Sequence, residues 1–247
     1  MKPAPPATPR LRHSDMDAKL KRNPGRLDRS RQAAPQIFET LRDRILSLEL
    51  KPNTLLSRAA LQSEFGISQT PLRDALMKLD QEGLVEVYPQ HATVVARIDI
   101  DAARQAHFLR IAIELEAVRR LAEKPSPAFI ARLRAAIGEQ RRMKARDYPG
   151  FVVADHAMHQ MFCEEAGVPD LWQIIRRQCG HIDRLRLLNL PLPGKIEAVI
   201  RDHEAIVDAI ERGEPDAAAA ALRKHLSGTL SIIDQIRERH PDYFLGS

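Results

Sequence analysis

Apolar residues in the first part of the chain predict three helices followed by two short strands. In the first and third predicted helices, apolar side chains recur three or four positions apart, so that they gather on one face. In the second, the apolar residues Leu56, Leu61, Phe65 and Ile67 lie at mixed spacings. The predicted strands are short and surround a turn that contains proline. The helices fall within residues 36–50, 55–67 and 68–85, and the strands within residues 84–88 and 93–96.

The second and third predicted helices have the features of a helix-turn-helix. Gly66 lies between them, where the end of a helix favours a residue that tolerates positive φ. Ser68 can cap the next helix with its hydroxyl, and Pro71 falls in the first turn, where a missing N–H costs nothing. One face of that helix is apolar and the other is polar. The apolar residues are Leu72, Ala75, Leu76 and Leu79, and the polar ones are Gln69, Thr70, Arg73 and Lys78.

The polar face of the third helix can hydrogen-bond phosphates or base edges. This is the arrangement of a recognition helix that lies in a major groove of DNA. The strand pair that follows is the expected wing, with Pro89-Gln90-His91-Ala92 at its tip. Residues 36–97 therefore predict a winged helix-turn-helix DNA-binding domain.

From residue 99 onward the pattern is helical throughout. Prolines and glycines separate the candidate helices, the connections are short, and clusters of β-branched residues are few, which predicts an antiparallel helical bundle. The predicted fold class is mainly α: an N-terminal winged helix-turn-helix, then an antiparallel all-α helical bundle over residues 98–243. Its helices are expected at residues 99–124, 127–146, 150–166, 170–190, 194–212 and 215–239.

Charge is distributed unevenly along the chain. The formal net charge is +5 for 247 residues, but residues 1–35 alone carry nine basic and three acidic side chains, which leaves −1 on the remainder. The high isoelectric point therefore describes this proline-rich tail and does not by itself indicate nucleic-acid binding by the folded part. We expect residues 1–35 to be a disordered basic tail, either an arm that attracts phosphates or a leader without a role.

Composition also bounds the location of the protein. No apolar run reaches the roughly 18 residues that a membrane span needs. The basic N-terminus lacks the apolar segment of a secretory signal, and Cys163 and Cys179 form neither a disulfide framework nor a C-x-x-C site. We therefore expect a cytoplasmic protein without a membrane partner.

The helix-turn-helix run resembles that of the GntR family of bacterial transcription regulators. Their domain carries a sequence like L-x-x-x-x-L-A-x-x-x-G-V-S-R-T-P-V-R-E-A-L-x-x-L-x-x-E-G-L-V. The resemblance implies binding to double-stranded operator DNA, with Arg73 as the first expected contact and Arg58, Ser68, Gln69, Thr70 and His91 as further ones. The matching residues are Leu56, Leu61, Gly66, Ser68, Thr70, Pro71, Arg73, Ala75, Leu76, Leu79, Glu82, Gly83, Leu84 and Val85.

The chain departs from the family pattern at two DNA-facing positions. Gln69 stands where arginine is usual before Thr-Pro, and a glutamine can pair bidentately with adenine, which predicts a shifted operator preference. At the wing tip, His91-Ala92 replaces the usual Arg-Gly. Alanine is costlier than glycine in a left-handed turn, which predicts a wing that bends differently or approaches the minor groove less closely.

Two residues in the helical part are spaced as metal ligands. Asp155 and His159 lie four positions apart, which places both on one helix face with Cβ atoms about 5–6 Å apart. His203 and His225 lie in later predicted helices, where a lone histidine is more often a surface or core residue. His156 and His181 are expected to take no part.

The helical part resembles the FCD ligand-sensing domain of the FadR-type branch of this family. FCD domains share D-x-x-x-H, then H-x-x-[IL]-x-x-A-[IL]-x-x-G-[DE], then a histidine in the following alanine-rich helix. The resemblance implies that Asp155, His159, His203 and His225 surround one divalent metal. This donor set is compatible with zinc, nickel or manganese, among which we expect zinc.

Arg110 matches the arginine of an R-x-x-x-E stretch in FCD domains, with Glu114 as its acidic residue. Two interpretations of Arg110 remain open. It either clamps the carboxylate of a ligand, or it pairs with Glu114 one turn later in the same helix. Arg184 and Arg186 could also reach a pocket in this domain.

Three hypotheses about function follow. The first is a homodimeric transcription regulator that senses a small carboxylate effector through the metal-containing bundle. The second is a metal-dependent enzyme acting on a small acid, which leaves the DNA-binding half unexplained. The third is a DNA-binding protein whose bundle only dimerises and senses nothing.

Overall fold

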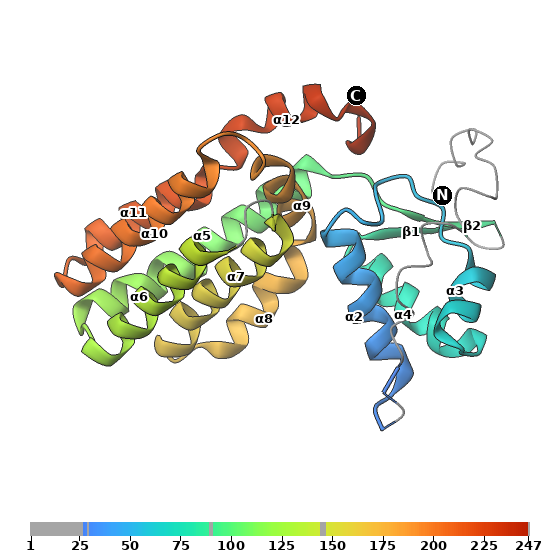
Figure 1. Ribbon diagram of the computed structural model, residues 1–247, viewed down its shortest axis with the longest axis horizontal. Helices are drawn as coiled ribbons and strands as arrows, with labels where there is room; N and C mark the ends of the chain where they lie inside the picture. Colours follow the sequence, from blue (N-terminus) through green and yellow to red (C-terminus); the bar gives the residue numbers. More distant parts are fainter. Residues whose placement is uncertain (1–26, 29, 89–90, 144–146, 247) are drawn as a thin grey trace. The chain divides into compact units, whose positions relative to one another are not determined.

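The computed structural model describes residues 27–28, 30–88, 91–143 and 147–246. The chain forms two compact units, with the boundary between Arg97 and Ile98 (Figure 1). The expectation of a disordered tail falls mostly on residues 1–26, which lie outside the described part. Its last three residues are helical, because the first helix begins at Ala33 and not at residue 36.

The first unit combines helices with an antiparallel hairpin. The two strands pair in register from Val85 with Val95 to Tyr88 with Ala92. Leu55 adds a single bridge to Val94 on the other edge of the second strand. The elements are α2 (Ala33–Leu46), α3 (Arg58–Phe65), α4 (Gln69–Gln81), β1 (Val85–Tyr88) and β2 (Ala92–Val95).

The predicted apolar faces form the core of this unit. Ile37, Leu41 and Ile45 of α2 have no exposed surface, and they belong to the same cluster as the apolar face of α4. That face comprises Leu72, Ala75, Leu76 and Leu79, which are at most 2% exposed. Arg42 of α2 also pairs with Glu82 at the end of α4, with 2.7 Å between Nε and Oε2. Apolar burial and one ion pair therefore fix α4 against α2.

The backbone around the helix-turn-helix agrees with the predicted turn, except at one cap. Gly66 ends α3 with φ +63°, and Asn53 adopts φ +67°, the left-handed region that asparagine tolerates. The expected capping bond from Ser68 is not formed within the described residues, although Ser68 is the N-cap of α4. Ser57 caps α3 instead, by accepting a hydrogen bond of 3.2 Å from the Ala60 N–H. The Ser68 hydroxyl is therefore exposed at the start of the recognition helix.

The second unit is an all-helical bundle with α5 at its centre (Figure 1). Helix α5 packs against α7, α8, α9, α10 and α11, while α10 also packs on α6 and α11. The elements are α5 (Ile100–Glu123), α6 (Pro127–Arg142), α7 (Tyr148–Glu165), α8 (Pro169–Gln178), α9 (Gly180–Asn189), α10 (Lys195–Glu211), α11 (Pro215–Ser227), η1 (Leu230–Ile232), α12 (Ile233–Arg239) and η2 (Pro241–Tyr243).

Two of the long helices expected from the sequence are interrupted. The one expected over residues 170–190 is broken at Cys179, and the one over 215–239 ends at Ser227. Both interruptions adjoin a glycine, Gly180 or Gly228, which lowers helix propensity by about 1 kcal/mol relative to alanine. The break at Cys179 matters most, because α9 then becomes a separate helix whose side chains are nearly all buried.

The C-terminal segment closes back on the start of the bundle. The Ile98 N–H donates to the Tyr243 carbonyl at 2.7 Å, and the Leu245 N–H donates to the Ile98 carbonyl at 3.0 Å. Phe244, between them, is fully buried. The Asp99 N–H donates to His181 Nδ1 of α9 at 2.9 Å. The first residues of this unit are therefore held by segments far away in the sequence.

Candidate metal centre and nucleic-acid interface

The residues expected to contact DNA are exposed on the first unit. Arg73 lies on the surface of α4 and forms no ion pair with any residue in the described ranges. Arg58, the first residue of α3, extends toward β2, where its Nη2 lies 3.4 Å from Thr93 Oγ1. The other exposed members of this set are Ser68, Gln69, Thr70 and His91. Of the expected wing tip, Pro89 and Gln90 lie outside the described residues.

Four residues that are distant in the sequence meet inside the second unit. Asp155 and His159 lie on α7, His203 on α10 and His225 on α11, and one ligand atom from each lies within 4.8 Å of the others. The first three side chains have no exposed surface, and that of His225 is 5% exposed. The motif resemblance named these same residues as one group, and the fold brings them together.

The distances between these ligand atoms fit a divalent ion. His159 Nε2 lies 3.1 Å from His225 Nε2. Asp155 Oδ1 lies 3.3 Å from His203 Nε2 and 3.9 Å from His225 Nε2, and Asp155 Oδ2 lies 3.6 Å from His159 Nε2. Ligands at roughly 2.0–2.2 Å from a tetrahedral ion are about 3.3–3.6 Å apart. Small side-chain adjustments would therefore bring all four onto one ion.

Two of the histidines are held in place through Nδ1, on the side of the ring that faces away from the centre of the cluster. His159 Nδ1 contacts Glu114 Oε2 of α5 at 2.5 Å, and His203 Nδ1 lies 2.8 Å from Gln140 Oε1 of α6. A partner on Nδ1 fixes the ring and its tautomer, so that Nε2 is left for the centre of the cluster. His203 Nε2 itself has no hydrogen-bond partner among the described residues. This arrangement is typical of a metal-binding histidine.

Electrostatics favour the protonation states that metal binding needs. Burial lowers the pKa of His159, and burial together with the neighbouring His203 and His159 lowers the pKa of His225. Burial alone would raise the pKa of Asp155, but Arg186 and then His159 outweigh it and hold that pKa well below its usual range. Neutral imidazoles and an ionised carboxylate are the forms that coordinate a cation.

Arg110 forms the intrahelical pair that the sequence left open. Its Nε donates to Glu114 Oε1 at 2.6 Å, and both side chains are buried. Burial alone would raise the pKa of Glu114, but Arg110 and His159 lower it to about 2. Arg110 therefore reaches the cluster through Glu114, which holds His159. Arg110 also lines a cavity beside His225.

A second buried polar group lies next to the cluster. His156 Nε2 lies 2.9 Å from Asp183 Oδ1, and Arg176 Nη1 donates to Asp183 Oδ2 at 2.6 Å. Arg186 of α9 connects the two groups, because its guanidinium pairs with Asp155 and lies 3.2 Å from His156 Nε2. His156 thus belongs to this network and is not one of the four clustered ligands.

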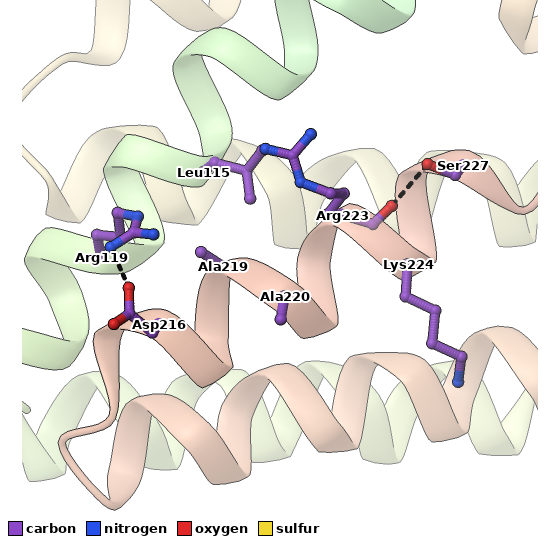
Figure 2. Close-up of a pocket in the computed structure, with 8 residues that line it drawn as sticks. All are labelled: Leu115, Arg119, Asp216, Ala219, Ala220, Arg223, Lys224 and Ser227. Carbon is purple, nitrogen blue, oxygen red and sulfur yellow. Dashed lines mark hydrogen bonds and ion pairs between the residues drawn. The ribbon is translucent and has the colours of Figure 1, made fainter.

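A separate hollow of about 420 Å³ lies on the surface between α5 and α11 (Figure 2). Its middle is walled by Leu115, Ala219 and Ala220, and at one end Arg119 pairs with Asp216 at 2.5 Å. Arg223, Lys224 and Ser227 also line it, but none of the four clustered residues does. We therefore do not place the functional site there.

Sequence reasoning missed the residues that support the cluster from other helices. Gln140 belongs to no motif, and its spacing from the ligands carries no signal because its contact with His203 is tertiary. Glu114 was noted only as a partner of Arg110. Arg186 was considered, but the break at Cys179 sets the direction in which its side chain points.

The two cysteines give a prediction about reactivity. Burial raises the pKa of the Cys163 and Cys179 thiols to about 12, so about one thiol in ten thousand is ionised at pH 8. We expect no reaction of the native protein with a thiol reagent within minutes, and reaction of both thiols after unfolding in guanidinium. Rapid labelling of the native chain would contradict the buried placement.

The first unit defines a class of protein: a DNA-binding regulator with a winged helix-turn-helix, here joined to an all-helical domain. The description "Bacterial regulatory proteins, gntR family" matches residues 33–95, and the FCD domain matches residues 105–228. The chain belongs to the GntR family of DNA-binding transcription regulators, in the branch that carries an FCD domain. All four clustered residues lie within the FCD match.

Relatives in other bacteria agree with this assignment. An HTH-type transcriptional regulator in an unstable DNA locus of Streptomyces ambofaciens is 35% identical over 208 residues, which are 84% of this chain and 88% of the relative. The HTH-type transcriptional repressor RspR of Escherichia coli K12 is 28% identical, over 85% of this chain and 92% of the relative. These relatives are transcription regulators and not enzymes, so the enzyme hypothesis is not supported.

Solved structures share the fold. Escherichia coli McbR/YncC superposes with a TM-score of 0.70 at 19% identity, covering 83% of this chain and 98% of that one. A GntR transcriptional regulator from Rhodococcus sp. RHA1 superposes with a TM-score of 0.65 at 17% identity, covering 81% and 97%. Among the described residues, no helix combines the length and apolar character of a membrane span.

Proposed function

We propose that this regulator is a cytoplasmic homodimer that changes its affinity for operator DNA when a small carboxylate effector binds in the helical domain. The observation that carries the proposal is the buried cluster of Asp155, His159, His203 and His225. A buried carboxylate beside three imidazoles is costly unless a cation or a network of bonds compensates it. A metal site on a domain separate from the DNA-binding one suits a sensor.

The cluster would hold one divalent ion, for which zinc is the expected choice and nickel or manganese the alternatives. When bound, such an ion supplies a positive charge and coordination positions for a carboxylate oxygen. The protein residues orient this site: Glu114 holds His159, Gln140 holds His203, and Arg186 pairs with Asp155. The guanidinium of Arg186 adds a second positive charge that attracts an anionic effector.

The effector must bind one conformation of the regulator better than another, or it would shift nothing. Helix α9 is placed where it can transmit a conformational change from the metal cluster to the start of the helical domain. It carries Arg186, beside the cluster, and His181, which accepts a hydrogen bond from Asp99 at the start of the unit. A displacement of α9 by the effector would therefore reach the junction with the DNA-binding domain.

For DNA recognition, a dimer would place two α4 helices in successive major grooves of a near-palindromic site. Arg73 would contact DNA from each copy, and Arg58, Ser68, Thr70 and His91 would add contacts. Gln69 can pair bidentately with adenine, so we propose an adenine at the operator position that it faces.

A mobility-shift assay with the promoter beside the protein's own gene tests this function. We expect specific binding that weakens as salt rises, because phosphate contacts release counterions. Binding should also respond to a carboxylate only when the protein is loaded with metal. Absence of any specific, salt-sensitive complex would refute the proposal.

A change behind the metal site gives a further prediction. Gln140 is 2% exposed and contacts His203 Nδ1, so Gln140→Leu should weaken zinc binding about 10- to 100-fold without removing a ligand. Competition with a chelating dye measures this change. Gln160→Leu serves as the control, since Gln160 is half-buried and bonds Glu164 on the same helix, away from the cluster. Equal zinc affinities for both variants would contradict the role of Gln140.

A further inference from the structure

A small cavity lies beside the metal cluster and contains an unusual side chain. It is lined by residues of α5, α9, α10 and α11, and by Thr229. The cavity adjoins the cluster, because His225 is among its lining residues. The polar members that matter here are Arg110, Arg186, Asn189, Lys195 and His225.

Asn189, the last residue of α9, has no hydrogen-bond partner for its side chain within the described ranges. It is 1% exposed, and neither its Nδ2 nor its Oδ1 is bonded. A buried amide without partners destabilises a fold, and leucine of similar size would fill the position at lower cost. Because Asn189 faces the cavity, its two polar atoms are available to whatever enters there.

The charge around Asn189 favours an anion. Arg186 and Lys195 line the same cavity. Burial lowers the pKa of Lys195, the nearby Asp202 opposes this effect, and Arg186 adds to it. Asp202, which also lines it, is engaged by Lys224 at 2.8 Å between Nζ and Oδ1. A carboxylate entering from the metal side would thus meet positive groups before it reaches the amide.

The Asn189 amide determines which further chemical group, besides the carboxylate, the ligand should carry. An asparagine side chain presents one donor group and one acceptor at neighbouring positions. A carboxylate can only accept, and it would leave Oδ1 unbonded, whereas a hydroxyl both donates and accepts. The cavity has a volume of about 20 Å³, which is room for one hydroxyl-sized group. A whole acid therefore requires Arg186 or Lys195 to move.

We propose that Asn189 is a specificity-determining residue that binds the hydroxyl group of a hydroxycarboxylic acid effector. This inference rests on the proposed function, because it assumes that the effector carboxylate is held at the metal and Arg186. It adds the chemical class of the effector and explains why an unpaired amide is kept at a buried position. Displacement of Arg186 or Lys195 on binding would move α9 or α10.

The test compares hydroxy acids with their deoxy counterparts on the zinc-loaded full chain by calorimetry. The pairs are lactate with propionate and malate with succinate. We expect the wild type to bind at least one hydroxy acid ten-fold or more tightly than its counterpart, since a site that bonds a hydroxyl rejects the analogue that lacks it. Asn189→Leu should bring this ratio close to one.

Two further measurements separate specificity from folding. Asn189→Leu should keep its zinc content and melt at the same or a higher temperature, because it removes an unpaired buried amide. Ser227→Ala, at the last residue of α11, removes a hydroxyl that donates to the Arg223 carbonyl and should leave the ratio unchanged. A variant that melts lower and still prefers hydroxy acids would show that Asn189 is only structural.

The outcomes distinguish this inference from the function on which it rests. If the wild type binds zinc and acids but ignores the hydroxyl, or if Asn189→Leu keeps the preference because the metal binds the hydroxyl, the role of Asn189 is wrong. If the wild type binds neither zinc nor any of the acids, the metal-dependent sensor itself is wrong. If only the role of Asn189 is wrong, operator binding should remain as proposed, and the mobility-shift assay measures it separately.

Discussion

Replacing His203 with alanine is expected to reduce the bound divalent metal from one ion per chain to none. His203 is fully buried, its Nδ1 is held by Gln140, and its Nε2 has no hydrogen-bond partner in the described part of the chain. Removal of a ligand should cost more than the roughly 10- to 100-fold that loss of an outer partner costs. Elemental analysis of the purified protein measures the change.

Thermal unfolding provides a second measure of the same change. At zinc concentrations near 1,000 times Kd, a site that exists only in the folded protein adds about 4 kcal/mol to the free energy of unfolding. This increment should be present in the wild type and absent in His203→Ala. His91→Ala is the matched control, because His91 is exposed on the DNA-binding unit. If His203→Ala keeps the metal content and the stabilisation of the wild type, the cluster is not the metal site. The helical domain would then serve only for dimerisation.

Replacing Arg73 with alanine is expected to weaken operator binding strongly while leaving the fold intact. Arg73 is exposed on α4 and makes no ion pair within the described residues, so its loss breaks no internal ion pair there. A bidentate arginine–base contact is worth about 1–3 kcal/mol, or roughly 5- to 150-fold in affinity. The loss would occur twice in a dimer. Fluorescence anisotropy over a range of salt concentrations measures it.

The salt dependence tells which kind of contact is lost. A phosphate contact would reduce the slope of log K against log salt by about one for each copy, whereas a base contact would relax sequence preference and leave the slope unchanged. Arg120→Ala is the control, since Arg120 pairs with Glu116 on the surface of α5. Equal DNA affinities for the Arg73 and Arg120 variants would show that Arg73 does not contribute to DNA binding.

Local patterns made most of the DNA-binding domain predictable. The apolar faces of α2 and α4 follow from helical spacing, and Gly66 and Asn53 adopt the positive φ that their residue types tolerate. The Ser68 cap did not form, because a residue type permits a cap without requiring it. Such short-range rules give the elements, but they do not decide between local alternatives of similar energy.

The helical domain shows where sequence reasoning stops. The four clustered residues could be named through a motif, but nothing local shows that Gln140 meets His203 or that Asn189 faces the same cavity. The Arg110–Glu114 pair was foreseeable from its spacing of four residues, whereas the contact of Glu114 with His159 was not. Contacts between helices depend on crossing geometry and on interruptions such as the one at Cys179, which one sequence does not specify.

The pairing of the C-terminal segment with Ile98 bears on how a signal could cross the chain. Ala96 is bonded to Leu84 through its N–H at 3.0 Å, and Ile98 is bonded to Tyr243 and Leu245. Arg97 alone separates these two anchored residues. About two soft torsion angles per residue are available at this joint, and they lie around Arg97. A signal that passes along the backbone between the two units would have to pass through these few rotations.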